Sequence, residues 1–594
     1  MKKYLLLFTI GPVKSFINDA RKTHDLFAGS ALLSKLTYIA IDQAKKEFEK
    51  DSFILITPVL IKGNTSIPNR FLASFTCDEK SVLKSKIDLI KKEVSDYFIS
   101  ILNKTKLPKE KELPKGALKQ LQDALDIKWV IIKETDNFKN DFIKINQELA
   151  SLKNYNAFGI STEIGRKCIV DGSRNVKFYR RSKDEQKITD KELLNKKLYQ
   201  EEGDVLILEN ETDIPIWQLQ EGEGLSAVSL AKRLYQNEPH LFPSTVAVCL
   251  MDLFEKLKEN GVFNIYKNIV QKRTKEIFLE HSDDQLFYKE NIHSILKKLR
   301  LSSKEKELID KHKAWSEDLE LPLTKYYALV RFDGDNLGDW FSGVHFKVDI
   351  DFKDAQIALS KQLGVFAQEI KDKIKEPIGK IVYAGGEDFM AFINIHHLFE
   401  ALKIINTTFL ETINNETLNR FKKEEAKLIT ISLGVAIAHY KQPLAMVLDK
   451  ASEMEKKAKD NNRNSFAIGV LKHSGNVIDC TFNWQYNKEE VLPILIEIHK
   501  HVTTKKFSTA FIRKIYHAFE EYGFNLSEEL TLSKIKLYVP GACNVKDKEL
   551  KANYIKHMIK NLKKLLKASK NNQIFGDFLL ILDFLTRKTD GKDN

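Results

Sequence analysis

The sequence predicts a multidomain α+β protein with two ferredoxin-like units, a small middle domain and a helical C-terminal domain. Its 594 residues, at roughly 100 to 200 residues a domain, correspond to about three to five domains. Hydrophobic residues make up 43% of the chain, against 25 glycines and 13 prolines, and this composition excludes fibrous and largely disordered proteins. Strand and helix patterns follow one another in the β-α-β-β-α-β order of ferredoxin-like domains.

The N-terminal segment has the pattern of a first α+β unit. A strand over 4–10 leads through Gly11 and Pro12 into one long helical pattern over 13–48. Two β-rich runs, 53–61 and 69–76, flank a turn-rich segment and predict a hairpin, and a helical stretch then begins near 80.

The second α+β unit is the more regular one. Its predicted elements are a strand at 326–332, a helix at about 354–374, a hairpin at 380–394, a helix at 397–415, a strand at 428–439 and a helix at 443–460. This succession is the complete ferredoxin-like order. Because both units start with a strand and a long helix, we interpret them as a diverged internal pair.

The rest of the chain is mostly helical. Helical patterns predominate from 243 to about 318 and again after about 472, where Met558, Leu562 and Leu565 share one face of a helix and lysines occupy the other. The predicted domains are a first α+β unit at 1–156, a small irregular domain at 157–235, a helical linker domain at 236–320, a second α+β unit at 321–475 and a helical domain at 476–594.

The charge balance favours anionic partners. The net charge is +13 and the pI is near 9.0. Both signs are abundant, with 95 Lys and Arg against 82 Asp and Glu, so charge alone leaves nucleic-acid binding and solvated helix faces equally open.

The compartment is predicted from cysteines and apolar runs. Five scattered cysteines without a CxxC pair fit a reducing environment. The N-terminal apolar run ends at Ile10 without a cleavage pattern, and no window has the 18 or more uncharged apolar residues of a membrane span. We therefore expect a cytoplasmic protein with no membrane partner.

Two acidic turns lie about fifty residues apart in the second unit. Phe-Asp-Gly-Asp-Asn-Leu-Gly spans 332–338, and Ala-Gly-Gly-Glu-Asp-Phe spans 384–389 inside the hairpin. Each turn alone is more typical of a hairpin with acidic surface residues. In a β-α-β-β order, however, the end of the first strand and the hairpin turn meet at one edge of the sheet, so their carboxylates can converge.

Converging carboxylates are typical ligands of Mg²⁺ or Mn²⁺. Asp333 with Glu387 or Asp388 would hold one or two such ions, with the Gly334 carbonyl as a further ligand. Ions placed there would polarise an attacking hydroxyl and stabilise leaving pyrophosphate, as nucleotidyl transfer requires. Gly385 and Gly386 would let a substrate approach the backbone closely.

A third element, Ala-Lys-Asp-Asn-Asn-Arg-Asn at 458–464, ends the helix predicted at 443–460. Lys459 and Arg463 can both bind phosphate groups. The lysine ammonium acts as a point charge, and the arginine guanidinium can donate two parallel hydrogen bonds. Taken alone, this segment is more typical of a solvated lysine-rich helix end.

These three motifs, in this order, resemble the palm domain that GGDEF-type nucleotide cyclases share with the large, polymerase-like subunit of type III CRISPR effector complexes. The opening IGPVKSFINDARKTHDLFAGSALLSKL, and the later SIPNRF, FPSTVAVCLMDLF and SLGVAIAHYKQPLAMVLDKASEMEKKAK, resemble the type III-B (Cmr complex) large subunit. This resemblance covers nearly the whole chain.

The resemblance implies two palm domains that face each other and bind ATP between them. It implies a partnership with other Cmr subunits, guide CRISPR RNA and target RNA, with target pairing activating synthesis of a nucleotide second messenger. By position, Asp333, Glu387 and Asp388 become the metal and catalytic residues, Lys459 a phosphate ligand, and Asp335 a weaker candidate for nucleotide contact. The first palm lacks an acidic turn, so we expect it to shape the pocket.

The sequence departs from the family in three places. The family usually has GGDD where this chain has Gly385-Gly386-Glu387-Asp388, which lengthens one carboxylate by a methylene. Many relatives carry an N-terminal HD nuclease domain, whereas this sequence starts at the first palm, so we expect the form without that nuclease. His24 with Asp25 does not replace it, because one His-Asp pair cannot build a di-metal site.

The third departure concerns zinc. The family's middle domain often holds zinc between two CxxC pairs, but the matching positions here are Cys168, Asp171, Ser226 and Ser229. Because one thiol, one carboxyl and two hydroxyls form a poor soft-metal site, we expect no structural zinc.

His396 and His397 follow the hairpin, and we interpret them as packing at a helix start rather than as metal ligands.

Several functions remain open at this point. The leading one is a nucleotidyltransferase that makes either cyclic oligoadenylate or AMP joined to S-adenosylmethionine. The alternatives are a catalytically silent RNA-binding scaffold subunit and a free-standing diguanylate cyclase that uses GTP without RNA.

Overall fold

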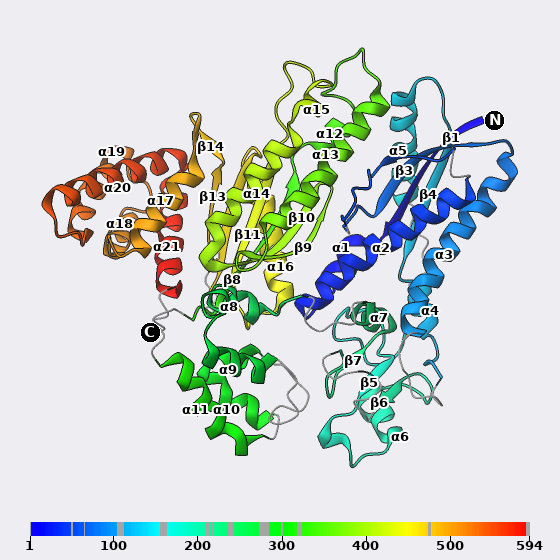
Figure 1. The fold of residues 1–594 in the computed structure, drawn as a ribbon, viewed down its shortest axis with the longest axis horizontal. Coiled ribbons are helices and arrows are strands. Elements are labelled where there is room, and N and C mark those ends of the chain that lie inside the picture. The colour runs from blue at the N-terminus through cyan, green and yellow to red at the C-terminus, as the bar shows by residue number, and fades with distance from the viewer. Residues whose placement is uncertain are drawn as a thin grey trace.

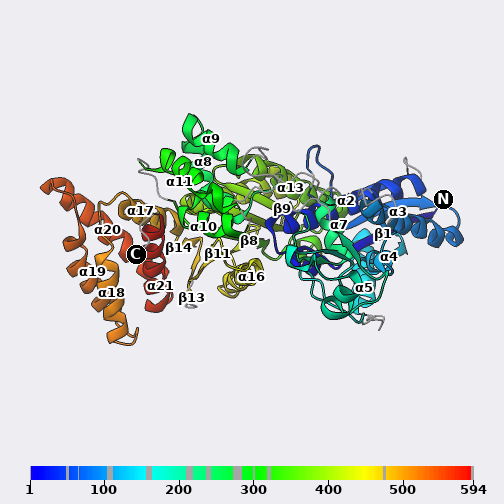
Figure 2. The same ribbon diagram turned by 90° about the horizontal axis from the view of Figure 1, so that it is seen from below.

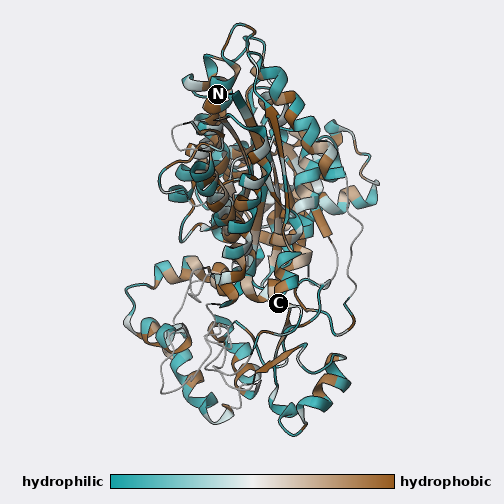
Figure 3. Ribbon diagram, turned by 90° about the vertical axis from the view of Figure 1, so that its right-hand side faces the viewer, coloured by the Kyte–Doolittle hydropathy of each residue, from teal (hydrophilic) through white to brown (hydrophobic). Residues whose placement is uncertain are grey.

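A computed structural model describes residues 2–48, 52–64, 66–103, 112–154, 163–208, 214, 218–235, 242–271, 284–298, 301–317, 323–472 and 477–589. The N-terminal α+β unit, the second α+β unit and the C-terminal helices follow one another along the long axis of the molecule (Figures 1 and 2). Hydrophobic strands form the interior of both α+β units, and hydrophilic helix surfaces face outward (Figure 3). The predicted α+β multidomain fold is confirmed.

The first unit is an antiparallel sheet in the order β2-β3-β1-β4. Its strands are β1 (Lys2–Gly11), β2 (Ile54–Thr57), β3 (Arg70–Cys77) and β4 (Asp126–Lys133). Alternate side chains of β1 enter different cores, Leu6 and Phe8 on one face and Leu5 and Leu7 on the other. The helices of this unit are α2 (Thr23–Glu47), α3 (Leu83–Asn103) and α4 (Ala117–Gln122) on the first face and α5 (Phe138–Asn154) on the second.

The helix predicted over 13–48 is two helices. A short α1 (Val13–Asn18) ends before a break, and α2 begins at Thr23. The Asp25 carboxylate accepts hydrogen bonds from the backbone N–H groups of Arg21 and Lys22, both at 3.2 Å, and so holds the non-helical connection. Apolar periodicity continues across this break, so the pattern alone did not reveal it.

The second unit has the predicted β-α-β-β-α-β order. Its core elements are β8 (Tyr326–Gly334), α13 (Phe352–Lys373), β9 (Gly379–Gly385), β10 (Asp388–Asn394), α14 (Leu398–Ile413), β11 (Ile431–His439) and α16 (Leu444–Asp460), with short helices α12 (Leu337–Phe341) and α15 (Glu416–Asn419) inserted. The strand order β11-β8-β10-β9 repeats the order β4-β1-β3-β2 of the first unit. The two units therefore share one topology, as the internal-pair interpretation requires.

This sheet is larger than the sequence pattern indicated. Strand β12 (Ser465–Leu471) pairs parallel with β11, and β13 (Val477–Asn483) pairs antiparallel with β12. The region after 472, predicted as helical, thus begins with a strand of the palm sheet, because a short apolar run does not distinguish strand from helix. The predicted boundaries after 156, 235, 320 and 475 lie outside the described residues.

The middle segment docks on the first unit. Strands β5 (Phe178–Arg180), β6 (Leu206–Leu208) and β7 (Gly224–Leu225) form a small sheet beside α6 (Asp190–Leu193) and α7 (Ala227–Tyr235). The buried Arg233 guanidinium of α7 pairs with Asp25 of α2 at 2.7 Å and with Glu223 at 2.9 Å. These ion pairs join the middle segment to the first palm.

Two helical groups complete the chain. The first contains α8 (Thr245–Lys256), α9 (Gly261–Gln271), α10 (Lys289–Lys298) and α11 (Glu305–Ser316). The second contains the hairpin β14 (Gln485–Tyr486) and β15 (Glu489–Glu490), followed by α17 (Val491–Thr503), α18 (Ala510–Glu521), α19 (Glu528–Tyr538), α20 (Lys548–Ala568) and α21 (Asn572–Thr589). In α20, Met558, Leu562 and Leu565 are buried, which confirms the predicted apolar face. No helix in the described ranges is long and apolar enough to cross a bilayer.

Candidate functional site

The two acidic turns lie side by side. Asp333 near the end of β8 pairs directly with Asp388 at the start of β10. The Gly334 N–H donates to the Glu387 carbonyl at 3.1 Å, so the adjacent pair, Asp333 with Asp388, is of the non-hydrogen-bonded kind in which facing side chains lie closest. The topology therefore brings the two carboxylates together, as the sequence order predicted.

The first palm lies against the Gly385-Gly386 turn. A Cβ atom added to Gly385 would lie 3.4 Å from Ser66 Oγ, and one added to Gly386 would lie 3.2 Å from Pro68 Cγ. Gly386 also has a φ of +74°, a conformation that favours glycine. Both glycines thus permit a close approach, and what approaches them in this structure is the loop between β2 and β3.

That loop is fixed to the second palm at several points along α13, which lies at the boundary between the two units (Figure 1). The Val59 N–H donates to Ser360 Oγ at 2.9 Å, and Lys371 Nζ donates to Asn64 Oδ1 at 2.8 Å. The site therefore lies at the junction of two palms, and residues from both border it.

The site disfavours negative charge. Burial, followed by the neighbouring Asp333 and Glu387 carboxylates, raises the pKa of Asp388 to about 7. Burial also raises the pKa of Glu387, although Arg70 of β3 opposes the shift. Asp388 is exposed at the end of the turn, so solvent screens part of the repulsion from Asp333 and Glu387.

A series of ion pairs adjoins the carboxylates. Lys459 Nζ forms an ion pair with Asp333 and another with Glu455 Oε1 at 3.0 Å, and Glu455 pairs in turn with Arg331. Burial opposes the charge of Lys459, but hydrogen bonds to Asp333 and Glu455 outweigh burial and raise its pKa. Lys459 therefore stays charged beside Asp333, where a phosphate group would compete for it.

Asp335 has a position different from the one expected. Its carboxylate accepts hydrogen bonds from Ser432 Oγ at 2.6 Å, Thr430 Oγ1 at 2.7 Å and the Asn464 N–H at 2.9 Å. The side chain is buried, and these bonds tie the end of β8 to β11 and to the 461–464 loop. This arrangement gives Asp335 a structural role and leaves little of its carboxylate for a nucleotide.

Arg463 lies in that same loop. Asn462, Arg463 and Asn464 have consecutive positive φ values of 64°, 59° and 44°. The Arg463 side chain is exposed, while its carbonyl accepts a hydrogen bond from Ser465 Oγ at 2.8 Å. The Arg463 N–H also donates to the Lys459 carbonyl at 3.1 Å, so the loop fixes the backbone of Arg463 while its side chain faces solvent.

The donor set fits a metal ion that is completed by a substrate. In the ranges that the structure describes, no three His, Cys, Asp or Glu side chains converge as a ready-made metal site. Mg²⁺, however, is usually bound by one or two carboxylates together with substrate phosphates and water. The facing Asp333 and Asp388, whose mutual repulsion a cation would relieve, satisfy this requirement.

The four positions that match a zinc site meet in the middle segment. The Asp171 carboxylate accepts hydrogen bonds from the hydroxyls of Ser226 and Ser229, the latter at 3.0 Å, and Cys168 Sγ lies 3.5 Å from Ser229 Oγ. Hydrogen bonds therefore connect the same four residues that a metal would otherwise join. The absence of zinc stays a prediction.

Both histidine motifs have structural partners. His397 lies at the start of α14, with Nδ1 2.8 Å from Glu400 and Nε2 3.2 Å from Asp252 of α8, as the packing interpretation predicted. His24 is buried next to Asp25, whose carboxylate pairs with Arg233.

Sequence reasoning expected the first palm to shape the pocket, but it did not single out which of its residues border the site, and it did not identify Glu455. The segment SIPNRF at 66–71 was noted only for its resemblance, although it supplies Ser66, Pro68 and Arg70 to the junction. Glu455 lies one helical turn before Lys459, and that i, i+4 spacing was the available signal.

Two ferredoxin-like units of the same topology, the second of which carries both acidic turns where it meets the first, define a double-palm fold. The family described as Cas10/Cmr2, second palm domain, matches residues 326–467, and the family described as CRISPR-associated protein Cmr2, N-terminal, matches residues 5–106. Both α+β units of the chain are therefore similar to the palm-containing Cas10/Cmr2 subunits.

Individual relatives agree with these two family matches. The CRISPR system Cmr subunit Cmr2 of Pyrococcus furiosus is 25% identical over 87% of this chain, and the chain spans 66% of that relative's length. A cryo-EM structure of the type III-B Cmr-beta in its apo state has a TM-score of 0.60 at 15% identity, covering 92% of this chain and 78% of that chain. The Cmr-beta structure bound to cognate target RNA gives 0.58 at 14% identity, covering 92% and 79%. These structures share the fold.

Proposed function

We propose that this chain is the nucleotidyltransferase subunit of a type III-B CRISPR complex and converts ATP to a nucleotide second messenger. The observation that carries the proposal is the direct pairing of Asp333 with Asp388 at the junction of the two palms. The other parts of the site support the same chemistry, because Lys459 supplies a cation for phosphate and the two glycines permit close approach.

Asp333 and Asp388 are the residues that would hold Mg²⁺ or Mn²⁺, with Glu387 beside them as the third catalytic carboxylate. When bound, such ions would polarise the attacking hydroxyl and stabilise the leaving pyrophosphate. In the reaction, a ribose hydroxyl oxygen bonds to the α-phosphorus, the bond from that phosphorus to the bridging oxygen breaks, and the hydroxyl proton passes to solvent.

Lys459 would orient the triphosphate. Its ammonium group pairs with Asp333 in the absence of nucleotide, and its raised pKa keeps it charged when it exchanges Asp333 for a phosphate oxygen. Ser66 and Arg70 of the first palm would close the other side of the pocket, with Arg70 favouring the ionised form of Glu387.

The proposed partners are other Cmr subunits, guide CRISPR RNA and target RNA, whose pairing would activate the site. The fold shared with a Cmr-beta chain solved with cognate target RNA supports this part of the proposal. The product is either cyclic oligoadenylate or AMP joined to S-adenosylmethionine as a co-substrate.

The test uses the reconstituted complex with guide and complementary target RNA, ATP and Mn²⁺, with and without S-adenosylmethionine, and mass spectrometry of the products. Asp333→Ala and Asp388→Ala should each abolish the product. Asp339→Ala is the matched control, because Asp339 is an exposed carboxylate in α12, six residues after Asp333. Unchanged ATP turnover in both site variants would favour the scaffold alternative, and product from GTP without RNA would favour a diguanylate cyclase.

A further inference from the structure

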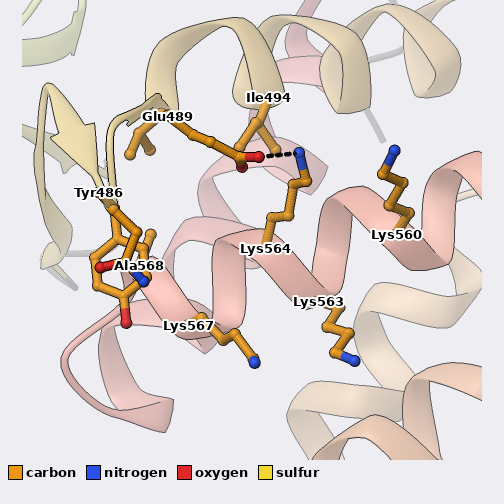
Figure 4. A pocket seen from close by; sticks show the side chains of 10 residues that line it. Tyr486, Glu489, Ile494, Lys560, Lys563, Lys564, Lys567 and Ala568 are labelled. Carbon is orange, nitrogen blue, oxygen red and sulfur yellow. Dashed lines mark hydrogen bonds and ion pairs between the residues drawn. The ribbon is translucent and has the colours of Figure 1, made fainter.

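A lysine-lined hollow lies in the C-terminal helical region, in a different domain from the candidate active site. Its volume is about 360 Å³, and its walls are the β14–β15 hairpin, the start of α17 and the last two turns of α20 (Figure 4). Lys560, Lys563, Lys564 and Lys567 line it from α20. This spacing of i, i+3, i+4 and i+7 puts the four residues along one helix face, over about 10 Å of helix axis. The ammonium groups of Lys560 and Lys564 extend to one side of this row, and those of Lys563 and Lys567 to the other (Figure 4).

The hollow carries excess positive charge. Glu489 is the acidic residue in its lining, and its carboxylate pairs with Lys564 at 2.8 Å, while Lys567 lies 3.7 Å from Glu528. Within the described ranges, no carboxylate lies within ion-pair distance of Lys560 or Lys563. Neighbouring like charges on one helix face destabilise a helix, so this row of lysines favours an anionic ligand.

An aromatic ring completes the lining. Tyr486 is 40% exposed and lies at the Ala568 end of the lysine row (Figure 4). Its position is set by the two-residue turn of the hairpin, since Asn487 and Lys488 both have positive φ, at 50° and 67°. An exposed aromatic face beside a basic groove is the combination by which proteins stack bases and neutralise phosphates of single strands.

We propose that this hollow binds single-stranded RNA, with backbone phosphates on Lys560, Lys563 and Lys567 and one base stacked on Tyr486. An acidic polypeptide would satisfy the lysines, but it would gain nothing comparable from the exposed ring, and for this reason the lining favours RNA. The net charge of +13 adds a long-range attraction for a polyanion. The site is independent of nucleotidyl transfer.

The test measures fluorescence anisotropy of a labelled 20-nucleotide oligouridine with the full-length chain, between about 50 and 200 mM KCl. The variant Lys560→Gln/Lys563→Gln/Lys567→Gln should bind at least about tenfold more weakly. Its plot of log affinity against log salt should be shallower by about 2, since each phosphate contact of a single strand contributes about 0.7. Lys548→Gln/Lys551→Gln/Lys556→Gln removes equal charge from the same helix outside the hollow, and we expect less than about a threefold effect.

Tyr486→Ala should weaken binding by about 5- to 100-fold, and Tyr486→Phe should preserve it, because stacking needs the ring and not the hydroxyl. Circular dichroism verifies that each variant is folded. Asp388→Ala should bind RNA normally, so that this proposal and the proposed function can fail separately. Equal losses in the two lysine triples would overturn the proposal, and so would a labelled polyglutamate that binds as tightly as RNA and is insensitive to Tyr486→Ala.

Discussion

At the scale of single residues, Asp388 is the carboxyl group that the site makes difficult to ionise. Burial and two neighbouring carboxylates raise its pKa to about 7 from an ordinary value of 3.8. The folded chain therefore binds a proton that the unfolded chain releases, and the free energy of unfolding falls as the pH rises from about 4 to about 7. Above pH 7 Asp388 is ionised, and its full destabilisation of the folded chain is present unless a cation binds.

Asp388→Asn should therefore stabilise the metal-free protein while it abolishes product formation. The side chain is exposed, and solvent screening reduces the effect to about 1 kcal/mol. If the second palm unfolds as a unit of about 150 residues, this corresponds to an increase of about 2 to 4 °C in its Tm at pH 7.5. Thermal unfolding at pH 5 and pH 7.5 measures it, and the gain should be smaller at pH 5. A lower Tm for the variant at pH 7.5 would contradict this account of the site.

The same pKa predicts how metal binding depends on pH. Below about pH 7 an ion must displace the Asp388 proton, so the affinity for Mn²⁺ should rise about tenfold per pH unit and become constant above pH 7. Titration calorimetry with Mn²⁺ and ATP between pH 5.5 and 8.5 measures this. A pH-independent affinity in the wild-type chain would show that Asp388 does not participate in binding the ion.

At the scale of elements, the turn between β9 and β10 has to accept the loop of the first palm. Gly386 is essential to this arrangement because it combines a φ of +74° with a neighbour 3.2 Å from where its Cβ would lie. The loop and the turn come from segments more than three hundred residues apart. Hydrogen bonds between α13 and the loop hold the loop against the second palm.

Gly386→Ala should cost about 1 to 2 kcal/mol in local backbone strain and push the turn away from Pro68. Since displacement of reacting groups by about 1 Å can cost about a hundredfold in rate, we expect product formation to fall between tenfold and a hundredfold. Gly338→Ala is the matched control, because nothing lies within 4 Å of its added Cβ and its φ is not positive. Wild-type activity of Gly386→Ala would show that the close approach is dispensable.

At the scale of the whole molecule, the middle segment and the first palm are joined by a buried ion-pair group. Arg233 of α7 is 1% exposed and pairs with both Asp25 and Glu223. Lys232 adds hydrogen bonds to the Phe16 and Asp19 carbonyls of the α1 segment, at 2.6 and 2.7 Å. These contacts hold α1 and α2, and with them the first palm, against the middle segment.

Arg233→Met should destabilise this junction by about 3 to 5 kcal/mol, because two buried carboxylates lose their partner. Thermal unfolding and limited proteolysis between the two parts measure the loss. Lys183→Met is the control, since its 3.8 Å pair with Glu221 is solvent-exposed and should contribute at most about 1 kcal/mol. Equal effects of the two substitutions would contradict a special role for the buried group.

The topology of the second palm and the acidic residues of its site follow from local sequence patterns. Apolar periodicity specifies each helix and strand locally, and the β-α-β-β-α-β order forces the end of β8 beside the β9–β10 turn. For this reason Asp333, Glu387 and Asp388 were predictable as neighbours.

The residues of other segments that complete the site depend instead on how the two palms dock. Ser66, Pro68 and Arg70 reach the turn because two separate domains dock, and no local pattern records such docking. Asp335 lies in the same motif as Asp333. Its carboxylate, however, accepts hydrogen bonds from Thr430, Ser432 and Asn464, so its side chain points into the protein interior. Local periodicity fixes elements and their order, whereas side-chain partners depend on contacts between residues distant in the chain.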